Sequence, residues 1–293
     1  MRWWTYQKER FPIFQHGILV MAFSSSAVAY SALLGNGAPG WDAFIVAFIS
    51  SFIFFLQLRI ADEFKDAEED ARYRPYRAVP RGLVSLRELG VVFGIGMLVQ
   101  LGLTLWLEPK LLTLLVVTWL YLGLMSVEFF VRDWLKKRHI TYLWTHMLIM
   151  PLVDLFATSC HWLPNESTTK GLIYFLIASF FNGIVIELGR KLRQPENEQE
   201  GVATYSKLWG LKTASLVWVA CIVTTAIFAS IAAVQINFLM PVLYILLPLC
   251  VWAASASFNH HKTTAKRFEL ISGLWTLALY LSLGIIPLIT LAS

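Results

Sequence analysis

Residues 41–60 read WDAFIVAFISSFIFFLQLRI, a stretch in which Asp42 and Arg59 are the only charged residues. A helix rises 1.5 Å per residue, so twenty apolar residues match the ~30 Å hydrocarbon layer of a bilayer. This stretch is therefore predicted to span a membrane as one helix.

Eight further stretches have the same length and apolar character. Hydrophobic residues make up 57% of the 293-residue chain and charged residues only 15%, which is too little polar surface for a soluble particle. We predict an all-α, polytopic membrane protein with about nine transmembrane helices around a central apolar cavity, forming one domain over residues 1–293. The expected spans are 11–34, 41–60, 87–107, 111–131, 140–162, 171–190, 211–234, 238–257 and 269–291.

Basic residues fall almost entirely in alternate loops. Of the 24 lysines and arginines, all but Lys110 and Lys170 belong to the N-terminal tail and to the second, fourth, sixth and eighth loops with their adjoining helix ends. The positive-inside rule then predicts a cytoplasmic N-terminus and, after nine spans, a C-terminus on the opposite side. The formal charge of +5 thus indicates topology rather than a nucleic-acid partner.

The second loop, LRIADEFKDAEEDARYRPYRAVPRG over residues 58–82, is dense in acids and bases. On a helix Glu63, Asp66 and Asp70 share one face, and Asp62 lies close to it. Clustered carboxylates suit a hard divalent ion such as Mg²⁺, which also binds phosphate oxygens.

Arginines at positions 72, 74, 77 and 81 follow these acids, and their forked guanidinium groups are suited to phosphate oxygens. The pattern also fits a solvated helix end whose acids and bases pair with each other.

The sixth loop, over residues 182–210, interleaves glutamates with bases. Its charged residues are Glu187, Arg190, Lys191, Arg193, Glu196, Glu198 and Glu200, followed by Lys207. Glu187 stands at the negative end of a helix, where an acid is disfavoured without a specific role, whereas the bases also suit an ordinary helix end.

These motifs resemble the UbiA superfamily of intramembrane prenyltransferases over nearly the whole chain. Residues 62–70, Asp-Glu-Phe-Lys-Asp-Ala-Glu-Glu-Asp, keep the spacing of that family's Asn-Asp-x-x-Asp-x-x-x-Asp motif, and Arg77-Ala-Val-Pro-Arg-Gly82 is similar to its Arg-Pro-Leu-Pro-Ser-Gly segment. Residues 131–142 resemble a segment with a Leu-Lys-Arg core, which implies phosphate-facing roles for Lys137 and Arg138. The second acidic motif departs from the family, because glutamates among bases replace its aspartate pair.

The resemblance implies nine helices, a cytoplasmic cap formed by the second and sixth loops, and a Mg²⁺-dependent enzyme. This enzyme would ionise a prenyl diphosphate and transfer the prenyl group to a small or lipid acceptor. The metal ligands would be Asp62, Glu63, Asp66, Asp70, Glu187, Glu196 and Glu198. The diphosphate would bind Arg72, Arg77, Lys137, Arg138, Arg190, Lys191 and Arg193.

Three polar residues lie deep in predicted spans. His146 and Asp154 are eight residues apart on the fifth span and share a helical stripe, so this pair is expected to accept a proton. With Asp66 and Asp70, they are the predicted catalytic residues. Glu128 is expected to pair with Arg132 at i+4.

Two alternatives remain open. A terpene cyclase would ionise the same diphosphate without an acceptor. A transporter would use Glu128, His146 and Asp154 as an ion pathway, although no internal repeat is evident. A CDP-alcohol phosphotransferase is disfavoured, because Ala67 follows Asp66 where its motif needs glycine.

Overall fold

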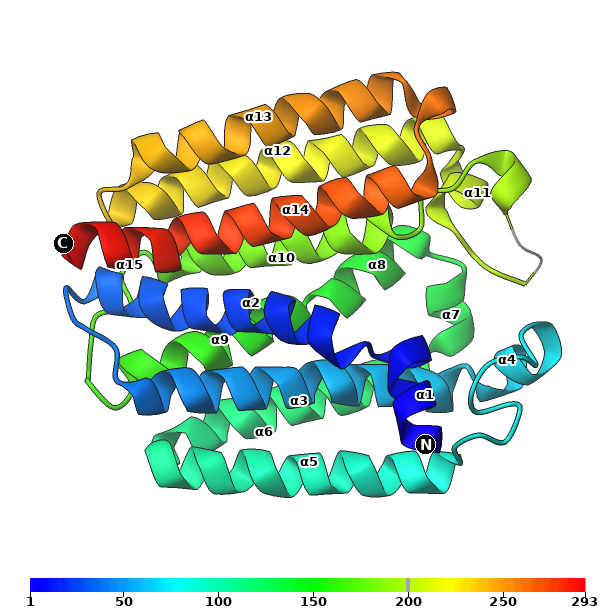
Figure 1. Ribbon diagram of the computed structural model, residues 1–293, viewed down its shortest axis with the longest axis horizontal. Helices are drawn as coiled ribbons and strands as arrows, with labels where there is room; N and C mark the ends of the chain where they lie inside the picture. Colours follow the sequence, from blue (N-terminus) through cyan, green and yellow to red (C-terminus); the bar gives the residue numbers. More distant parts are fainter. Residues whose placement is uncertain (199–200, 293) are drawn as a thin grey trace. The chain divides into compact units, whose positions relative to one another are not determined.

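The computed structural model describes residues 1–198 and 201–292. Within them no strand occurs, and nine helical segments are long and apolar enough to cross a membrane (Figure 1). These segments cover residues 13–34, 41–65, 86–107, 109–126, 139–162, 172–189, 211–235, 239–258 and 265–291. The predicted class is confirmed, and the chain is an integral multi-pass membrane protein. The largest differences are at the second span, which ends at residue 65 rather than 60, and at the fourth, which ends at residue 126 rather than 131.

The chain divides into two compact units. Unit 1 contains residues 1–28 and 39–166, and unit 2 contains residues 29–38 and those from Ser167 onward. Helix α2 (Ile13–Leu34) contributes to both. Each unit is described separately below.

Unit 1 is built around α3, which packs against α5, α6 and α9. In Figure 1, α3 and α5 run side by side, as their packing requires. The helices of this unit, besides part of α2, are α1 (Arg2–Arg10), α3 (Trp41–Lys65), α4 (Ala67–Tyr73), α5 (Leu86–Leu107), α6 (Leu112–Ser126), α7 (Arg132–Lys136), α8 (His139–Met147) and α9 (Ile149–Trp162).

Helix α5 turns polar residues inward and apolar residues outward. Gln100 is buried, donates from its amide nitrogen to the Ser50 carbonyl at 3.0 Å, and accepts from the Trp119 indole at 2.9 Å. Ile95 and Leu98 on the same helix are exposed. This polarity suits lipid, because hydrocarbon solvates apolar side chains while buried polar groups must find partners within the protein.

Unit 2 is built around α12, which packs against α10, α13 and α14. Gly189 at the end of α10 allows a close approach to α14, since a Cβ there would lie 2.0 Å from Ser272 Oγ. The helices are α10 (Leu172–Gly189), α11 (Tyr205–Trp209), α12 (Leu211–Gln235), α13 (Leu239–Phe258), α14 (Ala265–Leu283) and α15 (Ile285–Ala292).

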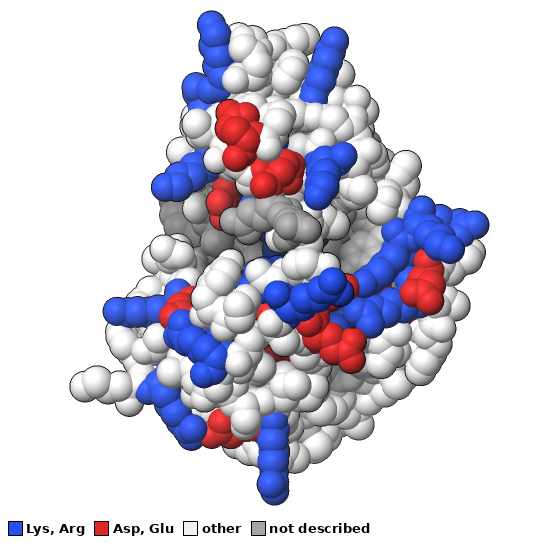
Figure 2. Space-filling model, turned by 90° about the vertical axis from the view of Figure 1, so that its right-hand side faces the viewer, with Lys and Arg blue, Asp and Glu red and all other residues white. Residues whose placement is uncertain are grey.

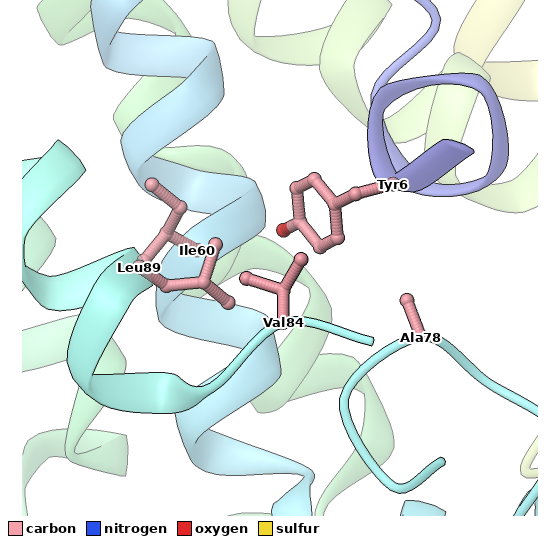
Figure 3. Packing of buried hydrophobic residues seen from close by; sticks show 5 residues of the cluster. All are labelled: Tyr6, Ile60, Ala78, Val84 and Leu89. Atoms are coloured by element: carbon pink, nitrogen blue, oxygen red, sulfur yellow. The ribbon is translucent and has the colours of Figure 1, made fainter. Parts of the chain in front are cut away.

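The first helix is packed onto unit 1 rather than projecting from it. Figure 3 shows the ring of Tyr6 in α1 directed toward Ile60 of α3 and Val84 of the following loop, and these residues form a buried apolar cluster with Ala78 and Leu89. This cluster joins α1 to the second loop, which carries the first acidic motif.

Candidate active site

The acidic motif of the second loop lies at a kink between two helices. Helix α3 ends at Lys65 and α4 begins at Ala67, and Asp66 between them has φ −97° and ψ 6°. The amide of Asp66 still donates to the Asp62 carbonyl at 2.9 Å, and the Asp70 amide donates to the Asp66 carbonyl at 2.8 Å. The kink sends the acids of the motif into different environments.

Glu63 faces α1. Its carboxylate forms an ion pair with the Arg10 guanidinium, and only 1% of the Glu63 side chain and 10% of the Arg10 side chain are exposed. A buried carboxylate needs such a counter-charge. Glu63 is therefore held by a residue 53 positions upstream.

Asp70 is buried between two arginines. Arg77 donates to Asp70 Oδ2 at 2.7 Å, and Arg74 Nε lies 2.9 Å from Asp70 Oδ1. Arg72, predicted to bind phosphate, is exposed, with its guanidinium carbon 5.1 Å from the Tyr73 ring centre. Asp70 thus orients two of the four arginines in this loop.

Asp66 is the acid at the centre of the motif. Burial raises its pKa above the ordinary value, Lys65 opposes the rise, and the carboxylates of Asp62, Asp70 and Glu69 add to it. Asp62 is more exposed and lies 3.4 Å from Lys65 Nζ. The Asp66 carboxylate is therefore poorly compensated by the protein alone, as expected of a group that receives a cation.

The fourth loop contacts this motif through residues that the sequence analysis did not single out. Lys136 Nζ donates to Glu69 at 2.5 Å, and this bond lowers the pKa of Glu69. Lys137 and Arg138, the predicted residues, are exposed, and Arg138 lies over the Trp134 ring. Figure 2 shows red acidic side chains among blue basic ones on the face that carries α4 and α7.

Lys65 joins the motif to α8. Its ammonium donates to the Tyr142 hydroxyl at 3.2 Å and lies 3.6 Å from Glu128. Glu128 also accepts from Tyr142 at 3.3 Å and lies 3.3 Å from His146 Nε2. Burial opposes ionisation of Glu128, but the hydrogen bond from His146 and the charge of Lys65 leave its pKa below the ordinary value.

The predicted pairing of Glu128 with Arg132 is wrong, because the backbone between them is not a regular helix. Glu128, Phe129 and Phe130 have φ of 52°, 53° and 60°, a left-handed turn without glycine. This turn directs Glu128 toward α8, while Arg132 lies 3.6 Å from Glu69. Consecutive left-handed residues with side chains are strained and need support from their surroundings.

His146 and Asp154 belong to two helices rather than one. Helix α8 ends at Met147 and α9 begins at Ile149, because Pro151 cannot donate a backbone hydrogen bond into the preceding turn. Both residues are buried, and both ring nitrogens of His146 face oxygens, those of Glu128 and of the Tyr142 carbonyl. The predicted catalytic role of the two residues stays a prediction.

In unit 2, Glu187 is enclosed by two bases. Lys191 Nζ lies 2.8 Å from Oε1, while Nε and Nη2 of Arg190 lie 2.6 and 2.5 Å from Oε2. Of the three side chains, that of Glu187 is 9% exposed, that of Lys191 30% and that of Arg190 46%. The bases are thus open to solvent and the acid is not.

The other acids of the sixth loop are separated. Glu198 accepts from the hydroxyls of Thr204 and Ser206 at 2.7 Å, whereas Glu196 is exposed. The Arg193 amide donates to Ser206 Oγ at 3.0 Å, which fixes the predicted phosphate-binding residue by its backbone. Glu200 lies outside the described residues.

Across the described residues of both units, no three acidic, histidine or cysteine side chains converge closely enough to hold a metal ion by themselves. Glu63 and Asp70 are buried and held by arginine, whereas Asp62 has a partly exposed side chain with longer contacts, 3.4 Å to Lys65 and 3.7 Å to Arg59. Among the four predicted metal ligands of the first motif, Asp62 and Asp66 are therefore the most open to a metal. Residues missed from the sequence are Arg10, Lys65, Lys136 and Tyr142. Lys65 was detectable as a base inside the acidic motif, but the partners of Arg10 depend on tertiary packing.

The fold and the charged loops define a polytopic all-helical membrane protein that brings carboxylates and guanidinium groups together where its helices end. The chain belongs to the UbiA prenyltransferase family, whose sequence model matches residues 22–277. Prenyl transfer is accordingly its class of reaction.

Solved structures agree with this fold. A UbiA homolog from Aeropyrum pernix K1 superposes with a TM-score of 0.70 at 13% identity, covering 93% of this chain and 98% of the other. A digeranylgeranylglyceryl phosphate synthase gives 0.63 at 16% identity, covering 96% and 98%. A UbiA homolog from Archaeoglobus fulgidus bound to DMAPP and Mg²⁺ gives 0.56 at 12% identity, covering 95% and 98%. No curated protein matches by sequence.

Proposed function

We propose that this protein ionises a prenyl diphosphate and transfers the prenyl group to a small or lipid acceptor, using Mg²⁺ held by Asp62 and Asp66. The observation that carries the proposal is the Asp66 carboxylate. It lies at a helix kink, half-buried, among the carboxylates of Asp62, Glu69 and Asp70, and Asp70 in turn orients Arg74 and Arg77.

The carboxylates of Asp62 and Asp66 are a suitable set of ligands for Mg²⁺. Mg²⁺ commonly takes one or two carboxylates and completes its octahedron with water and substrate phosphates, so two acids suffice. The raised pKa of Asp66 reflects burial and carboxylate repulsion, both of which a dication would relieve. When bound, Mg²⁺ supplies positive charge to the leaving diphosphate. The homologue solved with DMAPP and Mg²⁺ supports this choice.

The protein's own residues have three tasks. Arg77 and Arg74, oriented by Asp70, neutralise charge on the diphosphate as the bond between prenyl C1 and the diphosphate oxygen breaks. The acceptor then bonds to C1 and releases a proton, for which His146 and Asp154 are the candidate acceptors. The apolar helices exclude water from the allylic cation.

We also propose that the charged loops and the N-terminus are cytoplasmic and the C-terminus lies on the opposite side. The support is the alternation of basic loops along the nine spans.

The test uses membranes that contain the expressed protein, Mg²⁺ and isotope-labelled geranyl, farnesyl or geranylgeranyl diphosphate. We expect the label to enter a prenylated product with release of pyrophosphate. Asp66→Asn should lower the rate by about 10²-fold or more, since it removes a metal ligand and its charge. Glu68→Gln is the matched control, because Glu68 is an exposed acid in the same segment.

Three outcomes would contradict the proposal. Turnover that persists in the Asp66→Asn variant would refute the metal role of Asp66. A cyclic product formed by the purified protein without any acceptor would identify a cyclase. Metal uptake into proteoliposomes without pyrophosphate release would identify a transporter.

A further inference from the structure

The end of α10 in unit 2 carries a buried acid that is enclosed by two bases, as Asp70 is in unit 1. Both carboxylate oxygens of Glu187 face cations, with Lys191 Nζ at 2.8 Å on one side and Arg190 Nε at 2.6 Å on the other. The acid is buried and the two bases are partly exposed. A ligand reaching this end of the helix would therefore meet positive charge.

Such an arrangement does not fit a metal ion. A carboxylate that binds Mg²⁺ must direct oxygen lone pairs at it and lie among other anionic or water ligands. Mg²⁺ at Glu187 would instead lie against two unit charges of its own sign. The C-terminal end of a helix also favours cations of the protein itself.

Of the other described acids of the sixth loop, Glu196 is exposed and Glu198 is bound elsewhere. Both oxygens of Glu198 lie 2.7 Å from Thr204 Oγ1, and Ser206 donates to one of them. These bonds direct Glu198 to the start of α11. Among the described residues of the sixth loop, no second carboxylate joins Glu187.

We propose that, in this chain, Arg190 and Lys191 are a fixed cation pair that binds phosphate oxygens and leaves no metal ion at the end of α10, with Glu187 as their positioning residue. The inference rests on the proposed function, because it assumes a diphosphate substrate. Lys191 has three ammonium donors, of which one faces Glu187. The same ammonium makes a cation–π contact with the Tyr205 ring, whose centre lies 5.6 Å from Nζ.

The experiment counts metal ions rather than turnover. Mn²⁺ replaces Mg²⁺, farnesyl S-thiolodiphosphate serves as a substrate analogue that does not ionise, and electron paramagnetic resonance measures bound Mn²⁺ per chain. We expect one analogue-dependent Mn²⁺ per chain in the unmodified protein. Asp66→Asn should lose this ion, whereas Glu187→Gln should keep it.

A second measurement tests whether Lys191 binds the analogue. Lys191→Met should weaken binding of the analogue about tenfold or more, as expected for loss of a charge-assisted contact, without changing the Mn²⁺ count at saturation. Lys207→Met should change neither quantity, since Lys207 is an exposed base of α11 in the same loop.

The outcomes separate the two proposals. Two Mn²⁺ per chain, with one lost in Glu187→Gln, would overturn the fixed-cation pair and leave the proposed function standing. Unchanged analogue affinity in Lys191→Met would overturn it as well. Absence of any analogue-dependent Mn²⁺ in the unmodified protein would refute the proposed function itself. If Glu187→Gln does not fold, the count in the unmodified protein decides between one ion and two.

Discussion

The ion pair between Arg10 and Glu63 offers a direct test of how α1 supports the acidic motif. We predict that Glu63→Gln and Arg10→Gln each destabilise the protein strongly, and that the double variant loses much less than the sum. Each single change leaves one buried charge without its partner, since the two side chains are only 1% and 10% exposed.

The magnitude follows from burial. Removing one partner of a buried pair costs about 3–5 kcal/mol, mainly because the remaining charge is desolvated. In the double variant two neutral amides replace the ions, so we expect a coupling energy of about 2–3 kcal/mol. For a chain of this size a single variant should lower the melting temperature by on the order of 10 °C.

The assay is a double-mutant cycle of melting temperatures in one detergent. The control is a second cycle on Arg2 of α1 and Glu88 of α5, an ion pair whose side chains are 54% and 31% exposed. Exposed pairs couple by about 0.2–1 kcal/mol. Equal coupling in both cycles, or additive effects at Arg10 and Glu63, would refute the argument from burial.

Three further predictions concern stability. Because folding raises the pKa of Asp66, the folded protein binds that proton more tightly than the unfolded chain does. The free energy of unfolding should therefore fall as the pH rises from the ordinary aspartate pKa through the raised one. Melting curves of Asp66→Asn should lack this fall and show a higher melting temperature at neutral pH. Gly189→Ala should lower the free energy of unfolding by about 1–3 kcal/mol, because the new methyl group clashes with Ser272. Gly102→Ala should raise it by about 0.5–1 kcal/mol, because the space around its Cβ is open. Denaturation curves of both variants measure these changes. Phe130→Gly should be more stable than Phe130→Ala by about 1 kcal/mol, since only glycine relieves a φ of 60°, and equal melting would contradict the assigned strain.

The fold was predictable because few backbone structures can span a bilayer. Twenty apolar residues must form a helix to satisfy their own backbone, so span detection reduces to length and composition. The misplaced end of the fourth span has a local cause. The helix gives way to the left-handed turn at Glu128, and residues 127–131 contain neither glycine nor proline to mark it.

The charged loops of the candidate site could be recognised in the sequence, but the ion-pair partners of their side chains could not. Spacing on one helix predicted a shared face for Glu63, Asp66 and Asp70, but α3 ends at Lys65, and Glu63 faces Arg10 whereas Asp70 faces Arg74 and Arg77. Spacing carries no information about other helices. It therefore missed that Arg10 comes from α1 to neutralise Glu63 and that Glu128 reaches His146.

The packing of α1 bears on how this protein tolerates mutation. Tyr6 is buried against Ile60 and Val84, and Glu9 binds Arg81 at 2.8 Å, so the first ten residues hold the acidic loop at several points. Terminal segments usually accept substitution and insertion freely. Here residues of α1 contact the end of α3 and the acidic loop, so we expect substitutions in α1 to disturb the carboxylates of that loop as substitutions in the buried core would.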